Sequence, residues 1–446
     1  MNIMPCIHAA LLFASVIILI VAAQRHVHPF LALVVVATAF GLACGLSIGP
    51  LAKNFGTGFS EKIYSPGLAI VAAGFVASLA ESTGASDRLT AIIDRWRWLG
   101  SSRIATLLGL IAGIGASPAS AFALLTPLVR PIAGGKAPGR VATTLALAIS
   151  ASHGLVLLAP VPIAAAAILG AEWHRVALFG LPLAVLLAAA GAAYVRWLPF
   201  AEAALPPVNE PLPAAELRSG GSPLALFLAA AIPLLLLMEQ SLGEFPSEPL
   251  GGGPARELVI GIGRPLLIFI AAVGIMVIGN TRQGLKLLGD STWTARVLAN
   301  VASILLVVCA AGGLQALCQE TGMAELLGER LTGWPIGALG VLVPFLIAAV
   351  IKTLQGSSLV SAITAAGMVQ PILAPLGLGD VNATALAALA VGAGAMTVSH
   401  VNDEYFWLVT DRAGLSPPRG LTAFSGGTLL QGLIAAVAML LLSLVV

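Results

Sequence analysis

The sequence predicts an all-α polytopic membrane protein with two inverted repeats, and three observations support this prediction. Of the 446 residues, 58% are hydrophobic and 9% are charged, whereas soluble domains contain about 25% charged residues. Apolar runs of about 20 residues, enough to cross a bilayer, recur along the whole chain. Two longer apolar segments, 104–133 and 335–370, are interrupted and are expected to form re-entrant hairpins.

Composition also excludes several classes of protein and site. The net charge is +2, and no basic stretch is interleaved with aromatic residues, so we expect the lipid bilayer and no nucleic acid as a partner. The four cysteines have neither metal-ligand spacing nor a disulfide pattern, and we expect no metal site and no cofactor. Residues 7–23 lack a basic n-region, which favours an uncleaved first span over a signal peptide.

The apolar runs divide into two halves of five spans each. The first repeat, 1–195, is expected to contain spans 7–24, 29–48, 63–82, 141–169 and 176–195, with the hairpin 104–133 after the third. The second repeat, 223–446, is expected to contain spans 223–241, 258–279, 297–318, 383–410 and 422–446, with the hairpin 335–370 after the third. A Pro-rich segment, 196–222, is expected to be the cytoplasmic linker between them.

Basic residues predict how the chain is oriented. Both flanks of segment 104–133 are rich in Lys and Arg, so by the positive-inside rule it enters and leaves on the cytoplasmic side. Over the whole chain this rule places 15 of the 22 Lys and Arg inside and six outside. Lys352 remains, inside the membrane. Both termini are expected on the periplasmic side of a bacterial cytoplasmic (inner) membrane.

An odd number of spans in each half inverts the second copy relative to the first, as in many secondary transporters. At an offset of 238 residues the two halves share nine small, apolar or hydroxyl residues, including Ser120 with Ser358 and Thr126 with Thr364. Further along, Ser152 and His153 correspond to Ser399 and His400.

In each half, the hairpin is followed by a long run with a polar break, 141–169 in the first repeat and 383–410 in the second. Such discontinuous helices present backbone N–H groups and a positive dipole end at mid-membrane, where an anion can bind, while their free carbonyls can bind a cation. The two hairpin tips and two breaks are therefore expected to converge on one central site for a small organic anion.

The polar residues of these breaks are the candidate site. Ionisable and hydroxyl side chains at membrane depth must face protein, water or a ligand, since unpaired polar groups in hydrocarbon cost several kcal/mol. The residues expected to bind substrate are Lys352, Thr353, Gln355, Gly356, Ser357, Ser358, Ser399, Asn402, Ser152, His153, Ser117 and Ser120. Asp403, His400 and Glu404 are the candidates for carrying a coupled proton.

Each of these residues also has a structural interpretation. Lys352 could reach the outer interface as a snorkelling side chain instead of opposing a substrate carboxylate. Gly356 and the serines around it could be helix-packing residues. Glu404 could be solvated at the cytoplasmic interface, and His153 could be a structural histidine.

The strings IKTLQGSSLVSAITAAGMVQPIL and SHVNDEYFWLVTDRAGLS, together with GLAIVAAGFVASLAESTGASDRL and SHGLVLLAPVPIAAAAILGAE, resemble those of the gluconate permease family of the ion transporter superfamily. The resemblance covers nearly the whole chain and implies proton-coupled uptake of a sugar acid such as gluconate. Lys352 stands where the family usually has Arg, which replaces a planar bidentate fork with a point charge. Leu157, Leu158, Ala159 and Val161 stand where the family tends to have Pro, Pro, His and Gly.

Two other functions remain open at this stage. Free carbonyls at the helix breaks could bind sodium, which would make the protein a sodium-coupled anion transporter or an ion exchanger. A membrane-embedded hydrolase is a remote alternative, because no HExxH, nucleophile elbow or phosphate-binding loop is present. Spans outside the site leave room for a homodimer interface.

Overall fold

The computed structural model describes residues 4–25, 27–114, 117–134, 137–200, 221–244, 251, 253–322 and 339–445. Within these residues there are helices and no strands, which confirms the all-α prediction. Six helices are long and apolar enough to cross a membrane, or seven if one bent pair is a single span, so this is a multi-pass membrane protein. Most of the predicted linker, 201–220, and the start of the second predicted hairpin, 335–338, lie outside the described residues.

The helices of the first half follow the predicted runs, with two additions at 48–62 and 85–93. They are α1 (Met4–Gln24), α2 (Pro29–Ala43), α3 (Ile48–Lys62), α4 (Leu68–Thr83), α5 (Ala85–Ile93), α6 (Ser101–Ala112), α7 (Pro118–Ala133), α8 (Pro138–Leu155), α9 (Pro160–Leu169) and α10 (Trp173–Trp197). The span predicted at 63–82 is in fact the second part of a 36-residue run, Ile48–Thr83. Its first part, α3, contains so many polar residues that its hydropathy predicts a segment connecting two spans.

The helices of the second half are α11 (Pro223–Gly243), α12 (Pro254–Ile262), α13 (Pro265–Ile278), α14 (Thr281–Gly289), α15 (Ser291–Glu320), α17 (Leu342–Gln355), α18 (Ser358–Val369), α19 (Val381–Met396), α20 (Glu404–Arg412), α21 (Pro417–Gly420) and α22 (Gly426–Ser443). Besides the discontinuous helix expected in each half, the described residues contain a further interrupted run in each half. Helices α12 and α13 meet at 59°, and the run Ile48–Thr83 has non-helical backbone at Ser65.

Helices α6 and α7 contact each other across a short turn, as do α17 and α18. These four helices have 12, 16, 14 and 12 residues, which at 1.5 Å per residue is about 18–24 Å. That is less than the roughly 30 Å of a hydrocarbon core.

Two further breaks separate α8 from α9 and α19 from α20. The first spans residues 156–159 and the second spans 397–403. Pro160 at the start of α9 and Asp403 as the N-cap of α20 set these boundaries, because Pro fits the first helical turn and a carboxylate accepts the free N–H groups there.

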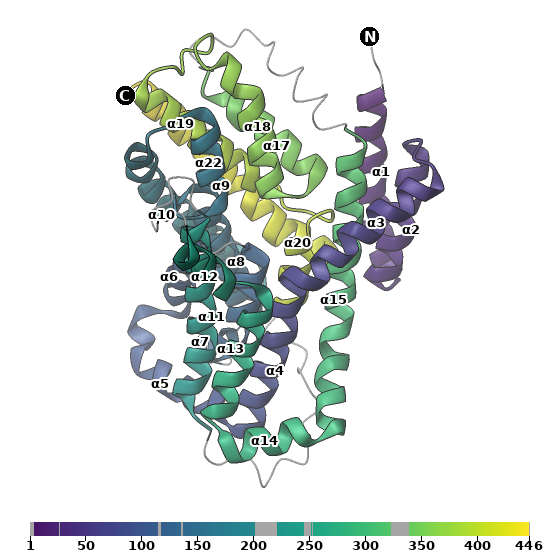
Figure 1. Ribbon diagram of the computed structural model, residues 1–446, viewed down its shortest axis with the longest axis vertical. Coiled ribbons are helices and arrows are strands. Elements are labelled where there is room, and N and C mark those ends of the chain that lie inside the picture. The colour runs from purple at the N-terminus through teal and green to yellow at the C-terminus, as the bar shows by residue number, and fades with distance from the viewer. Residues whose placement is uncertain are drawn as a thin grey trace.

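Packing brings these four features together (Figure 1). Helices α6 and α7 pack on α8, α17 packs on α19, and α18 packs on both α9 and α19. Helices α8 and α19 cross where Gly154 meets Gly392, and a Cβ on Gly392 would overlap the carbonyl oxygen of Gly154. The start of α1 and the end of α22 lie at the same end of the molecule (Figure 1).

Candidate functional site

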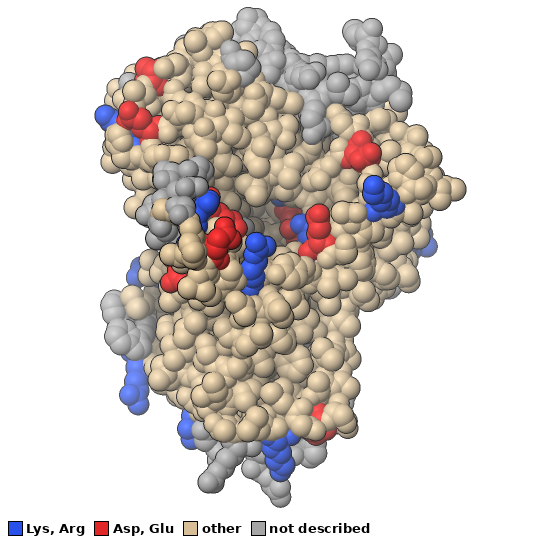
Figure 2. Space-filling model, viewed as in Figure 1, with Lys and Arg blue, Asp and Glu red and all other residues tan. Residues whose placement is uncertain are grey.

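A cavity of about 210 Å³ lies among the helix breaks, several times the roughly 30 Å³ that one water occupies in the liquid. Its walls are Lys62, Ser65, Ser117, Pro118, Ser150, His153, Lys352, Gly356, Ser357, Ser358, Leu359, Met396, Ser399, Asp403, Glu404 and Tyr405. These residues come from the α6–α7 turn, the end of α8, the α17–α18 turn, the α19–α20 break and the α3–α4 break. Charged side chains gather around a hollow at mid-height of the face in Figure 2.

A buried ion pair forms one wall. Lys352 Nζ lies 2.6 Å from Asp403 Oδ2 and donates a 2.5 Å hydrogen bond to the carbonyl oxygen of Gly356. The two side chains are only 3% and 5% exposed, so the lysine does not snorkel to an interface. At this burial a charge needs a partner, because an isolated ion pays a large desolvation penalty.

The end of α17 explains how Lys352 reaches this position. Gly356 follows the helix with a φ of +79°, a left-handed conformation that glycine adopts without a steric penalty. A Cβ there would also overlap the carbonyl oxygen of Asn402. The chain therefore turns tightly after Gln355, and Lys352 in the last turn of α17 faces the α19–α20 break.

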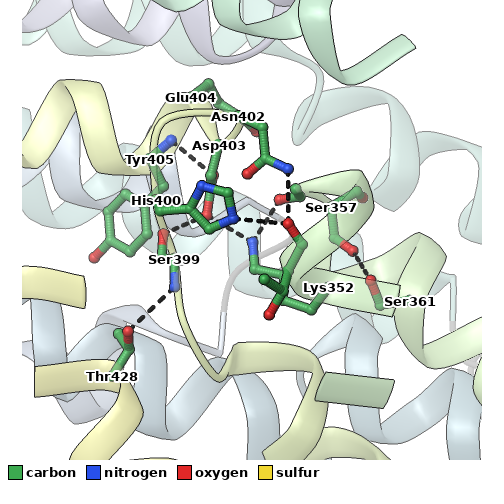
Figure 3. Close-up of polar contacts among 12 residues, drawn as sticks. Lys352, Ser357, Ser361, Ser399, His400, Asn402, Asp403, Glu404, Tyr405 and Thr428 are labelled. Carbon is green, nitrogen blue, oxygen red and sulfur yellow. Dashed lines mark hydrogen bonds and ion pairs between the residues drawn. The ribbon is translucent and has the colours of Figure 1, made fainter. Parts of the chain in front are cut away.

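The Asp403 carboxylate accepts two hydrogen bonds besides its ion pair with Lys352 (Figure 3). Its Oδ1 accepts the backbone N–H of Tyr405 at 2.9 Å as the N-cap of α20, and its Oδ2 also accepts the hydroxyl of Ser399. The backbone N–H of Ser399 donates in turn to Thr428 Oγ1 at 3.2 Å. The N-terminal dipole of α20 favours the negative charge of both Asp403 and Glu404.

His400 and Asn402 connect the α19–α20 break to the end of α17 (Figure 3). His400 Nε2 lies 2.7 Å from the carbonyl oxygen of Thr353, and Asn402 Nδ2 donates to the same oxygen at 3.0 Å. That carbonyl belongs to the last turn of α17, where helix carbonyls lack intrahelical partners. Both side chains are buried, 6% and 0% exposed, and neither lines the cavity.

The first half contains similar contacts between its discontinuous run and the end of a hairpin helix. Ser152 Oγ donates to the carbonyl oxygen of Leu110 at 2.6 Å, and His153 Nδ1 lies 3.3 Å from the carbonyl oxygen of Gly113. Both carbonyls are at the end of α6, the first helix of the other hairpin. In both halves, then, a histidine of the discontinuous run contacts the end of a hairpin helix.

Two helix N-termini point at the cavity. Ser117 caps α7 by accepting the N–H of Ser120 at 3.2 Å, and Ser357 caps α18 by accepting the N–H of Val360 at 3.4 Å. The first residues of both helices line the cavity. Free N–H groups and the positive dipole end make such termini suitable for an anion.

Of the residues predicted from sequence, the cavity wall includes Lys352, Gly356, Ser357, Ser358, Ser399, Ser117, His153, Asp403 and Glu404. The others are Thr353, Gln355, Asn402, Ser152, Ser120 and His400, and they lie behind the wall. Three of them, Asn402, His400 and Ser152, contact backbone carbonyls at the ends of hairpin helices.

Sequence reasoning missed Lys62 and Ser65. Lys62 Nζ lies 3.0 Å from Glu404 Oε1, so Glu404 is paired in the cavity and not solvated at an interface. Ser65 Oγ lies 3.5 Å from Ser120 Oγ, linking the α3–α4 break to α7. The signal was present in the Ser65–Pro66 dipeptide, since the residue before a proline tends to leave the helix.

The arrangement suits binding more than catalysis. The cavity combines two lysines, two carboxylates, several hydroxyls and two helix N-termini, which can hold a small polar anion from several directions. Among the described residues, no three His, Cys, Asp or Glu side chains are grouped to hold a metal ion.

A family model and several curated proteins match nearly the whole chain. A family model described as GntP family permease matches residues 5–445. The gluconate permease of Pseudomonas aeruginosa is 29% identical over 454 residues, covering 97% of this chain and 96% of that protein. The D-serine transporter DsdX of Escherichia coli K12 is 26% identical and covers 98% of each chain.

The low-affinity gluconate transporter of Escherichia coli K12 is also 26% identical and covers 94% of each chain. Among solved structures, the YdaH transporter of Alcanivorax borkumensis matches 94% of this chain and 98% of its own, with a TM-score of 0.40 and 15% identity.

Proposed function

Because this chain belongs to the GntP family of permeases, we propose that it carries gluconate, or a related small hydroxylated carboxylate, across the membrane together with protons. Its family and relatives are permeases and transporters, so the protein is a multi-pass membrane transporter and not an enzyme. Gluconate as the substrate rests on the relatives named for gluconate and on the chemistry of the cavity.

The observation that carries the proposal is the position of Lys352. Its side chain is buried, the residue borders the cavity, and its ammonium group bonds the carbonyl oxygen of Gly356, the residue before the N-cap of α18. A substrate carboxylate at this point would receive a full positive charge and backbone N–H groups together. The hydroxyls of Ser117, Ser357 and Ser358 are then available to a polyol chain.

The Lys352–Asp403 pair suggests how a proton is coupled to the substrate. An incoming carboxylate competes with Asp403 for Lys352 and places a second negative charge near it. A like charge favours the neutral form of a carboxyl group, so Asp403 takes up a proton when the substrate binds. The substrate anion and the proton thus enter together, and each is released when the other leaves.

Transport itself is proposed to proceed by alternating access, with the helix breaks opening the cavity to one side and then to the other. The inverted repeats, the cytoplasmic (inner) membrane location and the periplasmic termini are part of this proposal. The start of α1 and the end of α22 lie at the same end of the molecule in Figure 1, which supports termini on one side of the membrane.

A second candidate substrate is D-serine, favoured by the relative that transports it. Its carboxylate would use Lys352 in the same way, and its ammonium group would face Glu404. Sodium coupling is the alternative to proton coupling, with backbone carbonyls of the breaks as ligands.

Uptake of labelled gluconate by proteoliposomes tests the proposal. An inward proton gradient in sodium-free buffer should drive gluconate accumulation, and unlabelled gluconate should compete. Accumulation that requires sodium and ignores the proton gradient would overturn the coupling. Uptake of D-serine with no uptake of gluconate would overturn the substrate.

A further inference from the structure

A second ion pair lines the cavity beside the one between Lys352 and Asp403. Lys62, the last residue of α3, and Glu404, in the first turn of α20, lie 3.0 Å apart, and each side chain is 17% exposed. Both border the cavity. The proposed roles of Lys352 and Asp403 leave this second pair unused.

Lys62 is fixed in place by close helix packing. Helices α3 and α15 cross at two glycines, and a Cβ on Gly58 would overlap the carbonyl oxygen of Gly312. A Cβ on Gly312 would overlap Lys62 Cγ. The aliphatic part of Lys62 therefore lies directly over a glycine of α15, and its ammonium group is directed to Glu404.

Glu404 has one oxygen engaged and one free. Its Oε1 accepts from Lys62, whereas its Oε2 is buried and has no hydrogen-bond partner within the described part of the chain. An ionised carboxylate can only accept hydrogen bonds, and a buried acceptor without a donor is costly. Glu404 borders the cavity, so a rotation of its carboxylate would present Oε2 to a donor on a bound solute.

The two pairs serve different parts of a bound molecule. Asp403 is the extended N-cap residue of α20 and Glu404 is its first helical residue, and the two carboxylates pair with different lysines, Lys352 and Lys62. In Figure 3, Asp403 lies between Glu404 and Lys352. The cavity thus has a cationic group for a carboxylate at one place and an acceptor for a donor at another.

We propose that Glu404, positioned by Lys62, is a specificity-determining residue that accepts a hydrogen bond from the end of the substrate far from its carboxylate. This inference rests on the proposed function, since it takes Lys352 as the carboxylate anchor. It selects carboxylates with a terminal hydroxyl over those that end in a methyl group.

The test compares gluconate with 6-deoxygluconate, which lacks only the terminal hydroxyl. Titration calorimetry of the purified full-length protein in detergent gives the two dissociation constants and their ratio. For the wild type we expect 6-deoxygluconate to bind about 10- to 100-fold more weakly, as for loss of a hydrogen bond to a charged group. Glu404→Gln should bring this ratio close to one.

Two further variants separate specificity from folding. Lys62→Met/Glu404→Leu removes both charges at similar volume, which leaves no unpaired ion, and should also lower the ratio. Glu61→Gln removes an exposed carboxyl of α3 and should keep the wild-type ratio. A merely structural role for Glu404 would weaken both ligands equally and leave the ratio unchanged.

The possible results distinguish the inference from the proposed function. A wild-type ratio near one, or an unchanged ratio in Glu404→Gln and the double variant, would overturn the role of Glu404 while gluconate binding still stands. Wild-type protein that binds neither ligand would overturn the proposed function, and the inference with it.

Discussion

The pairing of Lys352 with Asp403 makes a quantitative prediction about stability. Lys352→Met keeps much of the side-chain length but leaves the Asp403 carboxylate, 4% exposed, without its counter-charge. Removing one partner of a buried pair costs about 3–5 kcal/mol. We therefore expect the free energy of unfolding to fall by about that amount.

Asp403→Asn tests the same pair from the other side. Asparagine remains a good N-cap, so the start of α20 is kept and the loss reports mainly on the unpaired Lys352. The double variant Lys352→Met/Asp403→Asn has no unpaired charge. Its cost should be smaller than the sum of the two single costs by about 2–3 kcal/mol, near the upper end for residues in contact.

The assay is equilibrium unfolding of the purified variants in mixed detergent micelles, followed by circular dichroism. Lys53→Met, at an exposed site on α3, is the control and should change the free energy of unfolding by no more than about 0.5 kcal/mol. Additive costs in the double variant would refute the reasoning, because they would mean that the two charges do not stabilise each other.

Three other substitutions test the site more locally. Gly356→Ala should lower stability by more than about 1 kcal/mol and abolish uptake, because its Cβ would overlap Asn402; Gly367→Ala, with open space around it in α18, should be neutral or stabilising in the same melts. Asp403→Asn should retain gluconate counterflow in proteoliposomes but lose accumulation driven by a proton gradient, and gradient-driven accumulation at the wild-type level would contradict the coupling. Tyr405→Phe removes a 2.9 Å hydrogen bond to a backbone carbonyl of α8 and should lower stability by about 1–3 kcal/mol; an unchanged unfolding curve would speak against that bond.

Much of the fold follows from local sequence rules. Apolar runs of membrane length predict the helices, and Gly, Pro and Asp at their ends predict where several begin and stop. The polar strings around Lys352 and Asp403 indicated a site because such residues are costly in a bilayer. The structure places those two side chains in contact.

Helix α3 could not be predicted in the same way. Residues 48–62 mix polar and apolar side chains, so their hydropathy resembles that of a connecting loop, although α3 packs closely on α15. Packing against a partner far along the chain decides that helix, and no local rule reports it. Lys62 lies between the predicted spans 29–48 and 63–82, so its pairing with Glu404 could not be predicted.

The sequence also could not predict which polar residues line the cavity and which only support its wall. His400, Asn402 and Ser399 lie within four residues of one another, yet only Ser399 faces the cavity. The other two are drawn to a carbonyl at the end of α17. Which polar side chain serves the backbone and which serves a solute depends on the three-dimensional position of that helix end.

The measurement that tests the central claim most directly is gluconate uptake by wild type and Lys352→Gln in proteoliposomes with equal amounts of inserted protein and the same inward proton gradient. If Lys352 holds the substrate carboxylate, wild type accumulates gluconate and Lys352→Gln does not, while the variant remains folded by circular dichroism. Accumulation by Lys352→Gln at the wild-type rate and affinity would contradict the account.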